Sequence, residues 1–144
     1  MEIDPREEVI YRFNLAVEHL EVAAKRFNIE DWAGVVQASQ LAAENAGKAV
    51  IAHFHIPSWT HDPSRELREL LGVLPVDLRE YIDKLIEITS RLAPEHGRTS
   101  YGLPAERITP GQLYDREYAE EVFHMAREAV DIARIILHYL GYDV

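Results

Sequence analysis

Apolar residues recur at three- and four-residue steps along most of the chain, which is the period of an amphipathic helix. The first such segment covers about residues 5–27 and ends before a short break at residues 28–31. Asp4 is placed to cap this helix, and Pro5 suits the first helical position. The apolar face is expected to consist of Val9, Phe13, Ala16, Val17, Leu20, Ala23 and Ala24.

A second helix is predicted from Trp32 to about Phe54, with Asp31 as its cap. Alanine and other small or apolar residues nearly encircle it, which is typical of a central helix packed on several sides. Glu44 and Lys48 stand four residues apart, in the order that favours an ion pair within a helix.

Three further helices are predicted: a short one over about residues 62–71, a fourth over about 75–92, and a last one from an Asp115 cap to about Leu140, where Gly141 stops it. Residues 93–113 are rich in proline and glycine and are expected to form a long loop laid against the body. No segment has the period of a strand. The prediction is therefore an all-α fold, an antiparallel up-and-down bundle of four to five helices, with residues 1–144 as a single domain.

Composition excludes several kinds of chemistry. The chain has no cysteine, so disulfides and thiolate sites are excluded. No apolar run approaches the roughly 18 residues of a membrane span, and a cytoplasmic protein without a membrane association is expected. The formal net charge of −10 disfavours strong non-specific binding to nucleic acid. Residues 91–116 are the exception, since their four arginines (91, 98, 107 and 116) exceed their three acids (95, 106 and 115) by one.

The second helix and its flanks carry a familiar pattern. Residues 38–49 read ASQLAAENAGKA, a His61-Asp62 pair opens the next short helix, and RTSYGLP from Arg98 precedes a last helix that begins near Tyr114. This order resembles the HEPN family (higher eukaryotes and prokaryotes nucleotide-binding), and the resemblance covers nearly the whole chain.

The resemblance implies a homodimer that often acts with a small nucleotidyltransferase partner in toxin–antitoxin pairs. It also implies RNA or a nucleotide as the ligand. Many members are metal-independent ribonucleases whose motif is an arginine followed, after four to six residues, by a histidine. In this chemistry the histidine moves the proton of the ribose 2′-hydroxyl, and the arginine stabilises charge on the phosphate.

Two pairs have this spacing: Arg91 with His96, and Arg12 with His19. Chance alone predicts about two matches in a chain of this composition, so the spacing by itself does not identify a catalytic pair, and the position of each pair in the chain is used instead. Arg91 and His96 lie in the segment where the acidic balance is relieved and are the candidate catalytic pair. Pro94 inside the motif would break the helical turn that orients them. Ribonuclease activity therefore stays open beside a non-catalytic nucleotide-binding or assembly module with a degenerate motif.

Arg98, Tyr101 and His61 are the candidate ligand-binding residues, His61 on the resemblance alone. The three tyrosines 101, 114 and 118 could stack on a base or hold the loop against the body. No cofactor or metal is predicted. The residues His53, His55, His61 and Asp62 could in principle bind a metal, but their spacing matches no strong pattern. Glu121 and His124 supply only half of a di-iron site.

Overall fold

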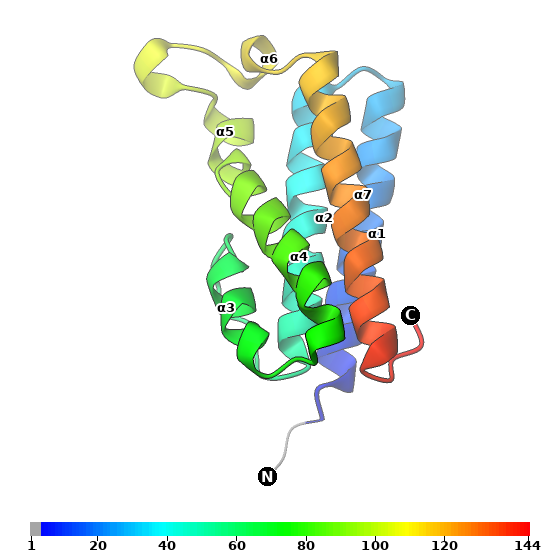
Figure 1. Cartoon of the computed structure of the whole chain (residues 1–144). Helices are drawn as coiled ribbons and strands as arrows, with labels where there is room; N and C mark the ends of the chain where they lie inside the picture. Colours follow the sequence, from blue (N-terminus) through cyan, green and yellow to red (C-terminus); the bar gives the residue numbers. More distant parts are fainter. Residues whose placement is uncertain (1–3) are drawn as a thin grey trace.

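The computed structural model describes residues 4–144. Within them the bundle is built from α1 (Arg6–Asn28), α2 (Trp32–Ala52), α4 (Arg79–Leu92) and α7 (Arg116–Tyr139). α2 lies at the centre and packs against the other three (Figure 1). The described residues contain no strand, so the all-α bundle is confirmed. No helix among residues 4–144 is long and apolar enough to cross a membrane.

The starts of α2 and α7 follow the predicted caps, whereas α1 begins one residue later than expected, at Arg6 with Pro5 as its N-cap. The Asp31 carboxylate accepts a hydrogen bond from the backbone N–H of Gly34 at 3.0 Å, and Asp115 accepts one from the N–H of Tyr118 at 2.9 Å. Each bond satisfies a donor that a helix start leaves free. Gly141 follows α7 with a φ of +98°, a conformation that glycine adopts without strain. These local signals explain why the boundaries of α2 and α7 were predictable.

α2 is buried on nearly every side, and its small side chains let neighbouring elements approach closely. A Cβ atom added to Gly47 would lie 3.1 Å from Pro63 and 3.3 Å from Leu67. The predicted third helix is α3 (Ser64–Glu69), continued by the turn η1 (Leu70–Gly72), and it packs directly on α2. The turn η2 (Val76–Leu78) leads into α4. The segment that precedes α3 is therefore held beside the middle of α2.

The prediction of a loop over residues 93–113 is wrong. This segment forms α5 (Glu95–Tyr101), η3 (Pro104–Glu106) and α6 (Pro110–Leu113). α5 and α6 lie against α2, and the turn between them projects sideways at one end of the bundle (Figure 1). Its prolines stand at the starts of helical turns, where the missing N–H costs nothing. Gly102 separates α5 from η3 with a φ of +65°, and a Cβ there would lie 2.0 Å from the carbonyl oxygen of Ile108.

Candidate functional site

Glu95 is the anchor of α5. Its carboxylate is only 2% exposed and accepts hydrogen bonds from the hydroxyls of Tyr114 and Tyr118, the latter at 2.8 Å. Burial, followed by the bond to Glu95, raises the pKa of Tyr118 to about 12 and raises the pKa of Tyr114 as well. Arg98 approaches the same carboxylate at 3.4 Å. Tyr114 and Tyr118 thus hold α5 against the start of α7.

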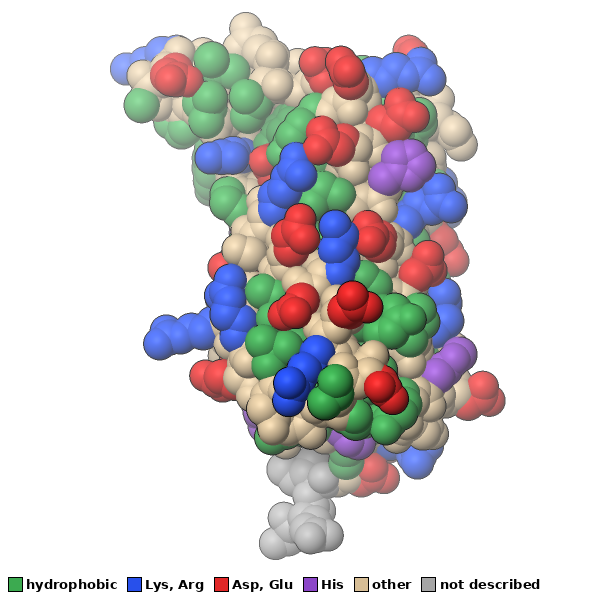
Figure 2. Space-filling view, in the orientation of Figure 1, with side chains coloured by type: hydrophobic (Ala, Val, Ile, Leu, Met, Phe, Trp, Pro, Cys, Tyr) green, Lys and Arg blue, Asp and Glu red, His purple; other side chains and the backbone are tan. Residues whose placement is uncertain are grey.

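Two arginines lie beside this anchor. Arg91 Nη2 is 2.5 Å from Glu121 Oε1 on α7, and both side chains are about half exposed (51% and 52%). The side chain of Arg98 is also about half exposed. Both guanidinium groups are close enough to Tyr118 for their charges to oppose the rise of its pKa. Acidic and basic side chains alternate over the faces of α4 and α7 (Figure 2). The guanidinium groups of Arg91 and Arg98 are thus accessible from solvent in the neighbourhood of Tyr118.

A hollow of about 350 Å³ opens next to Arg98. The rings of Tyr114 and Tyr118 stack with their centroids 5.9 Å apart and their planes 21° apart. The predicted ligand residue Arg98 is at this hollow, whereas Tyr101 is 74% exposed and is not among the lining residues. We call this region the α5–α7 surface; it comprises Arg91 together with the lining residues Glu95, Arg98, Leu103, Leu113, Tyr114 and Tyr118.

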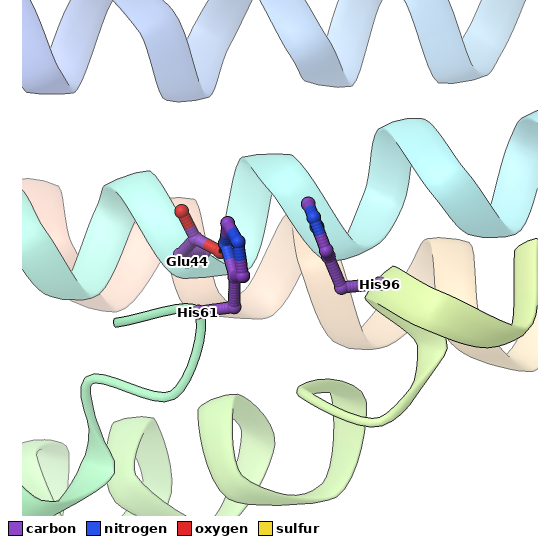
Figure 3. A group of neighbouring side chains, drawn as sticks. All are labelled: Glu44, His61 and His96. Atoms are coloured by element: carbon purple, nitrogen blue, oxygen red, sulfur yellow. Dashed lines mark hydrogen bonds and ion pairs between the residues drawn. The ribbon is translucent and has the colours of Figure 1, made fainter. Parts of the chain in front are cut away.

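A second polar cluster surrounds Glu44 in the middle of α2. This carboxylate is 6% exposed and receives three partners: Gln40 Nε2 at 3.1 Å, Lys48 Nζ at 3.3 Å and His61 Nδ1 at 3.1 Å. The ion pair with Lys48 predicted from the sequence is thus present. The ring of His61 stacks on that of His96, with centroids 3.5 Å apart and planes 16° apart (Figure 3). His96 Nδ1 lies 3.3 Å from Gln40 Oε1.

The two residues of the candidate catalytic pair form hydrogen bonds with different helices. Arg91 bonds to Glu121 on α7, whereas His96 bonds to Gln40 on α2. Pro94 lies between them, directly after α4 ends and before α5 begins. The structure instead brings His96 together with His61, a pairing that the spacing of the sequence did not suggest.

The other residue groups considered from the sequence are the pair of Arg12 and His19 and the histidines near the end of α2. Arg12 pairs with Glu8 at 2.9 Å and bonds Asn45 at 3.3 Å, and burial lowers the pKa of His19. Of the histidines near the end of α2, His53 bonds the Tyr142 hydroxyl at 2.8 Å, and His55 bonds the carbonyl of Ile56. Neither joins His61, so the metal group considered over residues 53–62 does not assemble. Sequence reasoning missed Gln40, although a polar residue within an alanine-rich helix was a usable signal.

Comparison with known proteins supplies the context for these sites. The sequence matches the family model described as HEPN domain over residues 11–136. The fold is similar to the crystal structure of TT1696 from Thermus thermophilus, with a TM-score of 0.68 and 23% sequence identity; the alignment covers 89% of this chain and 97% of that one. At that identity the likeness concerns the fold alone. No curated protein matches the sequence.

Proposed function

The chain belongs to the HEPN domain family, and we propose that it is a homodimeric binding module that takes RNA or a nucleotide at its α5–α7 surface. We further propose that it acts with a small nucleotidyltransferase partner, in a toxin–antitoxin-type pair. The family supports the partner and the dimer. The chemistry of the α5–α7 surface supports the ligand.

The observation that carries the ligand proposal is the placement of Arg91 and Arg98 around Tyr118. Two half-exposed guanidinium groups can each donate paired hydrogen bonds to phosphate oxygens. The adjoining hollow, at about 350 Å³, is at the lower end of the roughly 300–1,000 Å³ range of small-ligand pockets. Its leucines and the partly exposed ring of Tyr118 offer apolar and aromatic surface to a base. An acidic protein thus presents a local surface suited to an anionic, aromatic ligand.

Binding can be tested by fluorescence anisotropy with a labelled short single-stranded RNA, and by calorimetry with nucleotides. Removing one charge-assisted hydrogen bond costs about 1.5 kcal/mol, so Arg98→Ala is expected to weaken binding about tenfold. Arg79→Ala, at the opposite end of α4, is the matched control because it removes the same charge elsewhere. If the two variants lose the same amount of affinity, the net charge of the protein explains the loss, and the assignment of the ligand to the α5–α7 surface is wrong.

The assembly proposal has its own test. Light scattering after size exclusion is expected to give twice the mass of one chain. Co-purification with the product of an adjacent nucleotidyltransferase gene is expected to yield a stable complex. A monomer at micromolar concentration, or the absence of a complex with such a partner, would count against the assembly and leave the ligand proposal standing.

Metal-independent ribonuclease activity is the second candidate. It is favoured by the exposure of the ion pair between Arg91 and Glu121, since a guanidinium held at the surface can exchange a carboxylate for a phosphate. The bond of His96 to α2 instead favours the binding module. The test is RNA cleavage by purified protein in EDTA, compared with Arg91→Ala and His96→Ala. Cleavage that both variants retain would come from a contaminant or another site.

A further inference from the structure

We propose that Glu44, His61 and His96 form a binding site for a divalent transition-metal ion such as Zn²⁺. One ligand atom from each of the three side chains lies within 4.8 Å of the others. Imidazole nitrogens and a carboxylate oxygen are ligands that zinc binds well, and three protein ligands plus a water molecule make an open tetrahedral site. The proposal does not depend on RNA or nucleotide binding.

The contact between Glu44 and His61 has the separation that a shared metal requires. His61 Nδ1 and Glu44 Oε1 are 3.1 Å apart. Two ligand atoms at about 2.0–2.1 Å from a tetrahedral zinc ion are about 3.3 Å apart. A metal ion could therefore replace the proton between these two atoms with little change in the distance that separates them. Glu44 is buried on a rigid helix, which fixes the position of one ligand.

Gln40 prepares His96 for the same role. Its amide nitrogen donates to Glu44, so its amide oxygen is left to face His96. Because that oxygen can only accept, Nδ1 of His96 carries the proton and Nε2 keeps its lone pair. Such hydrogen bonds to the second ring nitrogen orient metal-binding histidines in general. Gln40 thus supports both the carboxylate and the imidazole of the proposed site.

Coordination requires one imidazole to tilt. Rings stacked 3.5 Å apart and nearly parallel cannot aim both lone pairs at one ion. His61 is the ring that can move, because it lies in the segment before α3 (Figure 3) and its side chain is 53% exposed. The side chains of Glu44 and His96 are more enclosed. The exposed side of His61 also gives an ion a route from solvent.

Lys48 influences the strength of the site without blocking it. Its ammonium group bonds Glu44 Oε2, whereas His61 bonds Oε1. The oxygen that faces the histidines is therefore free of the lysine, although the positive charge opposes a dication nearby. The three ligands come from α2, from the segment before α3 and from α5, so a bound ion would tie these elements together. It would also occupy His96, the candidate ribonuclease base.

The test is calorimetric titration of untagged, chelator-treated protein with ZnCl₂, together with absorption spectroscopy of bound Co²⁺. One ion per chain is expected, with the intense visible bands of a four-coordinate Co²⁺ site. His61→Ala and His96→Ala are each expected to lower the affinity at least tenfold, and Zn²⁺ is expected to raise the melting temperature of the unmodified protein but not that of these two variants.

His124→Ala is the matched control, since it removes an exposed histidine from α7, and it should bind Zn²⁺ like the unmodified protein. Glu44→Gln tests the third ligand, provided that circular dichroism shows this variant to be folded. If it is not folded, the two histidine variants decide whether the metal site exists. Binding without one-to-one saturation, or affinity unchanged in both histidine variants, would overturn the proposal. RNA binding by the α5–α7 surface would be unaffected by either result.

Discussion

Glu95 and Glu44 are both buried carboxylates, and the two regions around them meet the same energetic problem in different ways. Burying a charge is costly unless it is paired and hydrogen-bonded. Glu95 receives two neutral tyrosine hydroxyls and a half-exposed arginine. Glu44 receives an ammonium group, an amide and an imidazole.

The difference lies in the donors: those of Glu95 stay fixed and anchor α5, whereas those of Glu44 can be exchanged. Phenol hydroxyls with raised pKa values stay protonated and keep donating, so the Glu95 region holds α5 to α7. Imidazoles can exchange a proton for a metal ion, and one of the two in the Glu44 region is half exposed. Burial alone therefore says little about the role of a carboxylate; the chemistry of its donors decides.

The strongest test of the anchoring role of Glu95 is the variant Glu95→Ala. The change leaves the Tyr114 and Tyr118 hydroxyls without their acceptor and opens a cavity, so unfolding free energy should fall by about 3–5 kcal/mol. Urea unfolding followed by circular dichroism measures this loss. Glu106→Ala, which removes an exposed acid in η3, should change stability by no more than about 0.5 kcal/mol. A loss below about 1 kcal/mol for Glu95→Ala would contradict the anchoring role.

Glu44→Gln should have a smaller effect, about 3 kcal/mol, the lower end of the cost of breaking a buried ion pair. Glutamine keeps the shape and an acceptor, but Lys48, which is 5% exposed, loses its counter-charge. The double variant Glu44→Gln with Lys48→Met removes the stranded charge and should recover at least half of the loss in urea unfolding. If the double variant is no more stable than the single one, the ion pair is not what stabilises the Glu44 region.

Alkaline pH should weaken the Glu95 region. The pKa of Tyr118 is raised to about 12 in the folded protein, against about 10 when unfolded. Its contribution is therefore complete below about pH 10 and is lost as the pH rises from about 10 through about 12, because the unfolded chain releases its proton first. Unfolding free energies between about pH 9 and 11.5 should fall less steeply in Tyr118→Phe. Tyr101→Phe, which removes an exposed hydroxyl, should follow the unmodified protein.

The bundle was predictable because its signals are local. The apolar period of α1 and α7, and the caps at Asp31 and Asp115, are properties of neighbouring residues. The segment over residues 93–113 was mispredicted because its prolines start helical turns instead of ending them. Whether these prolines start or end a helical turn depends on the hydrogen bonds of Glu95 with Tyr114 and Tyr118, which follow Gly102 in the chain. The sequence does not reveal these bonds.

The candidate site was predictable only in part, for the same reason. The ion pair of Glu44 and Lys48 follows from their spacing on one helix. The convergence of His61 and His96 on Glu44 depends on how α3 and α5 pack against α2, and three separate elements leave no spacing pattern in the sequence. Arg91 and His96 illustrate the converse, since two side chains with a plausible spacing bond to different helices.

Arg91→Ala should have the smallest effect on stability and a clear effect on ligand binding. An ion pair with both members about half exposed contributes about 0–1 kcal/mol and is screened by salt. Urea unfolding at low and high salt should therefore differ little between this variant and the unmodified protein. RNA binding should nevertheless weaken about tenfold, as for Arg98→Ala. A stability loss above about 1.5 kcal/mol with unchanged RNA binding would make Arg91 a structural link between α4 and α7, and the α5–α7 surface would then lose one of its two phosphate-binding groups.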